Sequence, residues 1–282
     1  MSSVAAEWQG TRTALVIGVG TYADQAGFKN LDAPVRDARA MRDLLEDPEI
    51  GGYVVTMLGD PEIGRLRREL EQFLASRRSD ETALIYLSCH GLMTVRNKLY
   101  FAATDTEHTL PFATALEAVG LHEQLELCKA RRKIVILDCC FSGAFADAKS
   151  MESADLVRHL SPTEARGTVV LAASRPSESA YAARNHSRFT EALLTGLRTG
   201  AADRDRDGYV SVLEAFEYIQ DQLPEAGVEQ TPQLSIGHGE GGMIPLTRSP
   251  LAPATVPQPI RPEVRADPGE ATESPAPRTT TP

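Results

Sequence analysis

The strongest constraint on the fold is a regular alternation between short, continuously apolar runs and stretches with helical spacing. The first apolar runs, 14–20 and 53–58, are each followed by a helical pattern, in 33–47 and 62–78. A strand that is apolar on both faces is buried on both faces, which is typical of parallel sheets covered by helices. The chain therefore predicts an α/β fold with a mostly parallel central sheet.

The same alternation continues through most of the chain. We expect further strands at 82–91, 98–105, 132–140 and 167–174, and further helices at 113–130, 187–199 and 211–223. The run at 98–105 lies beside a turn-like VRNK segment and is alternatively part of a small hairpin. These elements are enough for one sizeable core with helices on both faces of the sheet.

Composition changes near Arg248, where Pro, Thr, Ala and Ser replace the apolar periodicity. We predict an N-terminal extension (1–11), one folded domain (12–247) and a disordered Pro-rich tail or linker (248–282) that tethers a partner or a fused domain. Neither a bilayer-length apolar run nor a signal-peptide pattern is present. We therefore expect a cytoplasmic protein without membrane contact.

Charge and cysteine content narrow the chemistry. The net charge of -10 argues against nucleic-acid binding, which needs clustered Lys and Arg, and suits a basic substrate better. The chain has four cysteines, and no CxxC pair among them has the spacing of a metal site. We expect reduced thiols rather than a disulfide framework.

Two of the predicted strands end in reactive side chains. LIYLSCHG brings His90 and Gly91 to one strand end, and IVILDCCFSG brings Cys139 and Cys140 to another. Parallel strands place their carboxyl ends at one edge of the sheet, and a thiol becomes a nucleophile when an imidazole lies within reach. A Cys–His pair is the functional interpretation, whereas two merely buried cysteines are the alternative.

The spacing and the residues of these two motifs resemble those of a known family. His90 precedes Cys140 by 50 positions, a spacing already known for caspases. SCHG (88–91) and DCCFSG (138–143) are similar to the SGHG and DSCHSG motifs of metacaspases and bacterial orthocaspases. The chain thus resembles the caspase-like cysteine peptidases (peptidase C14) over roughly residues 12–246. The resemblance implies a caspase-like three-layer α/β/α sandwich and a cysteine endopeptidase.

The resemblance also implies roles for the strand-end residues. Cys140 corresponds to the nucleophile and His90 to its proton-transfer partner, while the backbone N–H groups of Gly91 and Cys140 correspond to the oxyanion donors. Cys139 stands in the place of the motif's serine. Because neighbouring strand residues point to opposite faces, we expect Cys139 to pack in the core as a small hydrophobe.

Metacaspases cleave after Arg or Lys, and the positions matching their acidic pocket are Asp37, Ser88 and Asp138. Two carboxylates that face one pocket repel each other unless a cation satisfies them. The expected partner is therefore a protein or peptide substrate with basic residues. The alternative for Asp37 is a side chain that faces solvent or caps a turn.

The segment DRDRDGYVSVLE (203–214) matches the calcium-loop pattern D-x-[DN]-x-[DN]-G-x5-E without exception. Its expected ligands are Asp203, Asp205, Asp207, Tyr209, Ser211 and Glu214. The alternative is a polar loop between two helices in which Ser211 or a neighbour caps the second helix. Many metacaspases bind calcium at another acidic cluster, which this sequence matches incompletely. We expect no organic cofactor.

Two other functional classes are weaker. A catalytically silent or partner-activated adaptor module, in a bacterial signalling or defence pathway, would keep the fold, but loss of His90 or Cys140 would have marked that class. A nucleotide-binding fold based on VIGVGTY (16–22) is not supported, because the third spaced glycine is missing and no acidic residue ends the second strand.

Overall fold

The computed structural model describes residues 8, 10–23, 27–94, 96, 98–141, 167–173, 186–225, 232–237 and 243–251. Most of the predicted N-terminal extension and nearly all of the predicted Pro-rich tail lie outside these residues. An eight-stranded sheet forms the centre of the molecule, in the order β2-β1-β3-β6-β7-β9, with β4 on β3 and β5 on β4. Its strands are β1 (Arg12–Gly18), β2 (Val54–Gly59), β3 (Thr82–Met93), β4 (Leu99–Ala102), β5 (Ala115–Glu117), β6 (Arg132–Phe141), β7 (Thr168–Ala172) and β9 (Gln233–Ile236).

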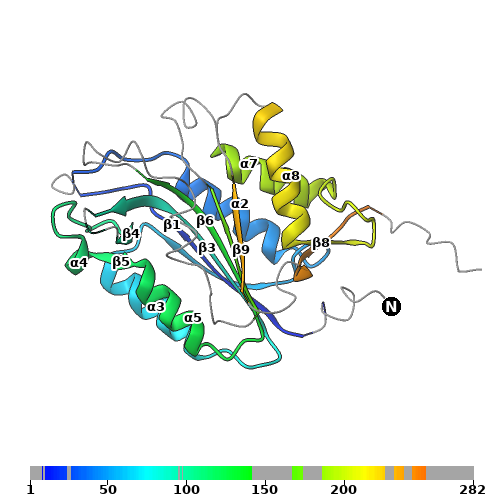
Figure 1. Cartoon of the computed structure of the whole chain (residues 1–282), viewed down its shortest axis with the longest axis horizontal. Helices are drawn as coiled ribbons and strands as arrows, with labels where there is room; N and C mark the ends of the chain where they lie inside the picture. Colours follow the sequence, from blue (N-terminus) through cyan, green and yellow to red (C-terminus); the bar gives the residue numbers. More distant parts are fainter. Residues whose placement is uncertain are drawn as a thin grey trace, which may run out of the picture.

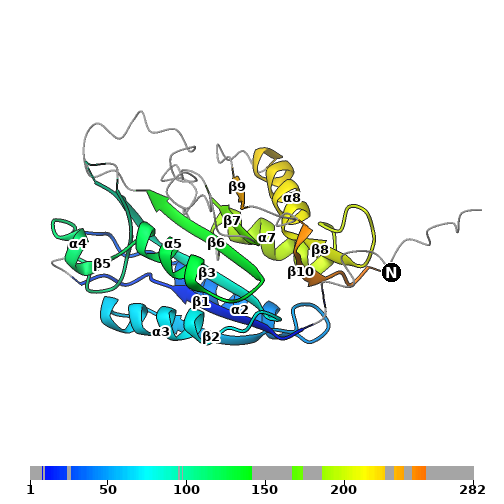
Figure 2. The same ribbon diagram turned by 60° about the horizontal axis from the view of Figure 1, so that its bottom comes forward.

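Helices cover both faces of this sheet (Figure 1). One face carries α2 (Pro34–Glu46), α7 (Arg188–Thr199) and α8 (Val212–Glu225); the other carries α3 (Ile63–Ala75) and α5 (Ala118–Leu127). The short α4 (Pro111–Thr114) joins β4 to β5, and β8 (Tyr209–Ser211) pairs with β10 (Pro245–Arg248) in a separate ribbon near α8 (Figure 2). The five strands β2, β1, β3, β6 and β7 are parallel, which confirms the predicted α/β sandwich.

Alternation along β3 divides the core into two halves. Leu84 and Tyr86 pack with α2, α7 and α8, whereas Ile85, Leu87 and Cys89 pack with α3 and α5. Every residue of this strand except the last is buried, so almost none of its surface is exposed to solvent. Since each fully buried aliphatic side chain stabilises the fold by roughly 1.5–3 kcal/mol, the strand register is strongly determined. The next even-numbered positions, 88 and 90, therefore lie on the face of α2 and α7.

The prediction of one continuous helix at 113–130 is wrong, because strand β5 interrupts that segment. Ala115 and Leu116 are buried where β5 pairs antiparallel with β4, and α5 begins only at Ala118. The pairing energy and burial outweigh the helix preference of this Ala- and Leu-containing segment. The alternative of a hairpin at 98–105 is confirmed, since β4 returns antiparallel beside β3.

The turn after β1 is packed against, and hydrogen-bonded to, other residues of the same chain. A side chain at Gly20 would lie 2.4 Å from the carbonyl oxygen of Leu31, so only glycine fits there. The backbone N–H groups of Gly20 and Thr21 donate to Asp60 Oδ1 at 2.7 and 2.9 Å. These amides are the ones that a nucleotide phosphate would need, so the turn does not act as a phosphate cradle.

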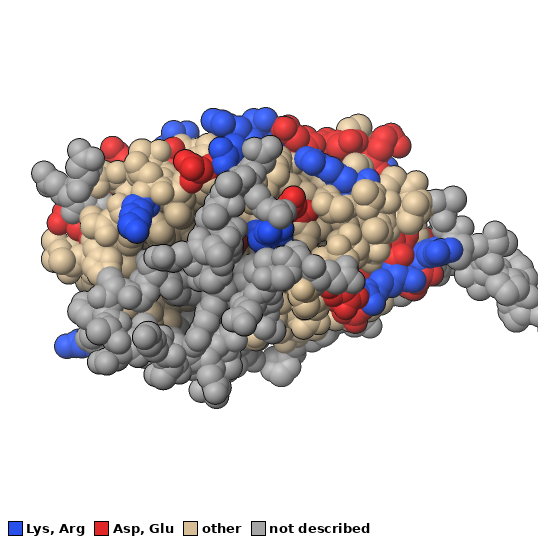
Figure 3. Space-filling view, turned by 90° about the horizontal axis from the view of Figure 1, so that it is seen from above, with Lys and Arg blue, Asp and Glu red and all other residues tan. Residues whose placement is uncertain are grey.

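On the face drawn in Figure 3, basic and acidic side chains lie side by side over the described surface. Such a mixture does not create the single-sign field that attracts a polyanion. Across the described parts of the chain, no helix combines the length and the apolar character needed to cross a bilayer.

Candidate active site

Strand register brings the predicted site positions together. β3 and β6 are adjacent and parallel, with Ser88 paired to Asp138 and His90 paired to Cys140. Residues two apart on a strand lie on the same face, so these four positions share the face of α2 and α7 at the carboxyl ends of the strands. Gly91 follows within β3, in the part that borders both β4 and β6. The Cys140 side chain lies outside the described atoms.

The loop after β1 encloses the His90 ring. Phe28 stacks on it with a centroid distance of 5.3 Å and an interplanar angle of 22°, and Tyr22 lies 5.0 Å away on a tilted plane. His90 Nε2 is 2.9 Å from the backbone oxygen of Lys29. A carbonyl oxygen only accepts hydrogen bonds, so Nε2 carries the hydrogen and Nδ1 keeps a lone pair.

The second ring nitrogen of His90 has different surroundings. Its Nδ1 atom is buried and has no hydrogen-bond partner among the described residues. Burial lowers the pKa of His90 below the ordinary histidine value, because the charged form loses its hydration. The imidazole is therefore neutral at neutral pH, and Nδ1 is its basic atom.

The neighbouring cysteines lie on the opposite face of the sheet. Cys89 and Cys139 form an in-register pair with their sulfur atoms 3.6 Å apart, and both pack in the core beneath α3 and α5. Both are reduced, as is Cys128. The alternation argument thus predicted the place of Cys139 correctly.

Two buried carboxyl groups lie under the start of α7. Oδ1 of Asp37, from α2, lies 2.6 Å from His186 Nδ1, and its Oδ2 accepts from the backbone N–H of Ser187 at 3.2 Å. Asp138, from β6, accepts from the hydroxyl groups of Ser187 and Thr190, the latter at 2.7 Å. Asp37 is completely buried, so the alternative in which it faces solvent is wrong.

Electrostatic coupling changes the protonation of this pair. Burial, reinforced by the nearby charge of Asp138, raises the pKa of Asp37 to about 8, and burial also raises the pKa of Asp138. Burial lowers the pKa of His186. At neutral pH the Asp37–His186 contact is thus an uncharged hydrogen bond, in which the carboxyl O–H donates to Nδ1. Ser88, buried on the same face, completes the predicted pocket positions.

The sequence did not reveal the partners of these carboxyl groups. Ser187 directly precedes a helical pattern, and its hydroxyl accepts from the N–H of Thr190 at 3.0 Å, so its role as the N-cap of α7 was a readable signal. Its second bond, to Asp138, joins residues 49 positions apart. Neither this bond nor the contact between His186 and Asp37 could be predicted from local sequence, because each joins residues far apart in the chain.

Comparison with known proteins identifies the fold family. The family model described as the caspase domain matches residues 11–238. The chain belongs to the caspase-domain family. Among solved structures it is similar to protein GSU0716 from Geobacter sulfurreducens, with a TM-score of 0.61, 17% identity, and coverage of 86% of this chain and 99% of that one.

A second solved structure supports the same fold for this caspase domain. Caspase-1 from Spodoptera frugiperda matches with a TM-score of 0.54 and 13% identity, covering 81% of this chain and 88% of that one. At such identities the likeness is one of fold. A search of the curated proteins found no match. Caspase domains are usually peptidases, and this one has the peptidase fold.

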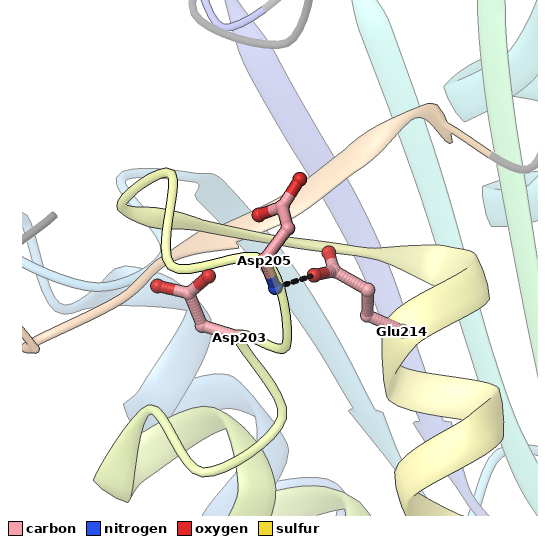
Figure 4. A group of neighbouring side chains, drawn as sticks. All are labelled: Asp203, Asp205 and Glu214. Atoms are coloured by element: carbon pink, nitrogen blue, oxygen red, sulfur yellow. Dashed lines mark hydrogen bonds between the residues drawn. The ribbon is translucent and has the colours of Figure 1, made fainter. Parts of the chain in front are cut away.

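The acidic loop of the caspase domain lies apart from the strand ends, between α7 and α8 (Figure 4). Asp203, Asp205 and Glu214 each bring a carboxylate oxygen within 4.8 Å of the others. Ser211 Oγ accepts from the Glu214 N–H at 3.2 Å, and Glu214 Oε2 accepts from the Ser211 N–H at 2.8 Å. This reciprocal capping box is the helix-capping alternative, and it is present in the structure. Asp207 accepts from the N–H of Tyr209 at 3.0 Å.

Proposed function

We propose that this caspase-domain protein is a cysteine endopeptidase with Cys140 as nucleophile and His90 as its proton-transfer partner, cleaving after Arg or Lys. The supporting observation is the state of His90. Its Nε2–H is bound to the Lys29 carbonyl, and its buried Nδ1 keeps a lone pair with no described partner. Its strand position is paired with that of Cys140. A neutral imidazole with one fixed tautomer is the partner that a thiol nucleophile needs.

The proposed reaction has two halves. His90 Nδ1 takes the thiol proton of Cys140, and the thiolate attacks the peptide carbonyl carbon to form a C–S bond. The imidazolium then gives its proton to the leaving amine as the C–N bond breaks. In the second half Nδ1 takes a proton from water, which attacks the thioester and releases the thiolate. The backbone N–H groups of Gly91 and Cys140 are the proposed donors to the oxyanion.

The proposed specificity rests on Asp37, Ser88 and Asp138. The two carboxyl groups are satisfied by hydroxyl, amide and imidazole groups of the chain, so a substrate cation is not needed to hold them in place. A guanidinium that approaches them would stabilise the ionised form and lower the pKa of Asp37. Binding of an Arg side chain should therefore release a proton, and its affinity should rise as the pH approaches about 8.

The test is hydrolysis of matched fluorogenic peptides with Arg or Asp before the scissile bond. We expect cleavage of the Arg peptide only, complete loss in Cys140→Ala, and a fall in kcat/KM of about 10²–10⁴-fold in His90→Ala. Cys128→Ala is the matched control, because it removes a buried thiol at the end of α5, outside the paired positions of β3 and β6. The acid limb of kcat/KM should lie below pH 6.5, since the pKa of His90 is lowered.

Three results would count against the proposal. Activity that survives in Cys140→Ala would exclude Cys140 as the nucleophile. Preference for the Asp peptide would contradict the basic specificity while leaving the dyad intact. A wild type that is inactive on both peptides, with and without calcium, would favour the adaptor function.

A further inference from the structure

We propose that residues 203–214 bind a calcium ion, at a site separate from the strand ends and independent of the proposed peptidase activity. The first observation is the gathering of carboxylates. Oxygen atoms of Asp203, Asp205 and Glu214 lie within 4.8 Å of one another, and Figure 4 shows Asp203 and Asp205 on the loop and Glu214 on the adjoining helix α8. Acidic clusters on surfaces are common, so a second observation is needed.

The second observation is an unpartnered carboxylate oxygen on Asp203. Asp203 is only 5% exposed. In Figure 4 its side chain lies beside the other two carboxylates. Its Oδ2 atom accepts from the N–H of Gly208 at 3.3 Å, whereas its buried Oδ1 has no hydrogen-bond partner among the described residues. A buried carboxylate oxygen without a donor is costly, and a cation bound to it removes the cost.

A nearby arginine does not fill this role. The Arg204 guanidinium points to α8, where it pairs with Asp221 and lies 3.3 Å from Glu217. Its charge is therefore engaged outside the loop. Among the described residues, no cationic side chain forms an ion pair with Asp203, Asp205 or Glu214. Three like charges at this spacing repel unless a cation lies between them.

The donor set favours calcium over other metals. The available ligands are carboxylate oxygens and backbone carbonyls, with no His or Cys in the loop, which selects a hard cation. Calcium accepts six to eight oxygen ligands in flexible geometry. Asp207, the Tyr209 carbonyl and Ser211, through water, would complete the set. Glu214 would exchange its bonds to backbone N–H groups for the metal.

The surrounding structure explains what the ion would stabilise. The loop joins α7 to α8, which pack so closely that a side chain at Gly196 would lie 2.7 Å from the Tyr218 ring. Its end is held as β8 against β10. A bound ion would link the end of α7 to the first turn of α8, and calcium should therefore raise the thermal stability of the whole domain.

The test uses the 282-residue chain carrying Cys140→Ala, which removes the proposed nucleophile, after treatment with a chelator. Calorimetric titration with calcium chloride should give one site with Kd between about 10⁻⁶ and 10⁻³ M. Calcium at a hundredfold excess over Kd should raise the Tm by roughly 5–10 °C, whereas sodium chloride of equal ionic strength should not.

Two substitutions separate metal binding from ordinary packing. Asp203→Asn and Asp205→Asn should each weaken calcium binding by about a hundredfold or more, since each removes a charged ligand. In chelator, Asp203→Asn should be at least as stable as its parent, because it replaces a buried carboxylate whose Oδ1 has no described donor with a neutral amide. In calcium the order should reverse. Asp221→Asn is the matched control, because it removes a carboxylate next to the loop but outside the cluster.

The proposal is overturned if the parent chain shows neither calcium heat nor a rise in Tm. It is equally overturned if Asp203→Asn and Asp205→Asn bind calcium like the parent, or if Asp221→Asn weakens binding as much as they do. None of these readouts depends on peptidase activity, so failure here and failure of the proposed function are distinguishable.

Discussion

At the scale of single residues, burial affects the bases and the acids of the site in opposite ways. It lowers the pKa of His90, which keeps the imidazole neutral and able to take a proton. It raises the pKa of Asp37, which makes that carboxyl group hold a proton near neutral pH. The site therefore carries less charge than its residue types suggest.

Asp37→Asn should reveal this stored proton. The pKa of Asp37 is about 8 in the folded protein and 3.8 ordinarily, so the folded state binds the extra proton between these values. The stability that this proton contributes is complete below pH 3.8 and is lost as the pH rises to about 8. Asparagine resembles the neutral carboxyl group, so the Tm of the variant relative to wild type should increase from pH 5 to pH 9.

The control for this measurement is Asp43→Asn, an exposed carboxylate on the same helix. Its Tm difference from wild type should be small, because an exposed ion pair contributes little to stability. A Tm difference for Asp37→Asn that is flat across the range would show that Asp37 is ionised throughout, contrary to the raised pKa.

At the scale of elements, the start of α7 does two things at once. Ser187 caps the helix by accepting from the Thr190 N–H at 3.0 Å, and its hydroxyl donates to the buried carboxylate of Asp138. A helix that begins on a buried carboxylate is held in one position on the sheet. The cap therefore couples the placement of α7 to the pocket.

Ser187→Ala should cost about 1–3 kcal/mol in the free energy of unfolding, because it removes the cap and one donor to Asp138. Chemical denaturation measures this loss. Thr195→Ala is the control, since Thr195 is exposed on the same helix and its hydroxyl donates only to the Glu191 carbonyl at 2.7 Å. If both variants lose the same stability, the bond to Asp138 contributes nothing.

The elements also show where local pattern was sufficient. Strands β1, β3, β6 and β7 were predicted because continuous apolar runs indicate burial on both faces. The run of β2 was also predicted as a strand, but β2 lies at the edge of the sheet, where Val54 is 70% exposed. The short strands β5, β8, β9 and β10 were not predicted, because each is three or four residues long and is defined by its partner rather than by its own pattern. The segment of β5 was predicted to be helical because its own residues favour helix, whereas its pairing with β4 makes it a strand.

At the scale of the whole molecule, one buried arginine joins the two ends of the described chain. Arg12, 4% exposed at the start of β1, donates to the Tyr53 hydroxyl at 2.6 Å and to the carbonyl oxygens of Pro245 and Leu246 at 2.9 and 2.8 Å. Its guanidinium also lies 3.8 Å from the centre of the Trp8 ring. These contacts hold β10, and with it the ribbon beside the acidic loop, against the central sheet.

Arg12→Met should destabilise the protein by about 2–5 kcal/mol, because it keeps the aliphatic volume but removes the donors to buried acceptors. The free energy of unfolding in urea measures the effect. Arg78→Met is the control, since Arg78 is exposed and its solvent-screened ion pair with Asp80 should contribute little to stability. Equal losses in the two variants would contradict a stabilising role for the hydrogen bonds of Arg12 to Tyr53 and β10.

The sequence by itself determined the α/β class, the positions of the buried strands and the residue types at two strand ends, because hydrophobic pattern and side-chain chemistry are local properties. The dyad of Cys140 and His90 stays a prediction from those motifs. Only the tertiary structure decided the tautomer of His90, through the Lys29 carbonyl, and the protonation of Asp37, through Asp138. These depend on burial and on atoms brought together from distant parts of the chain, which no local pattern encodes.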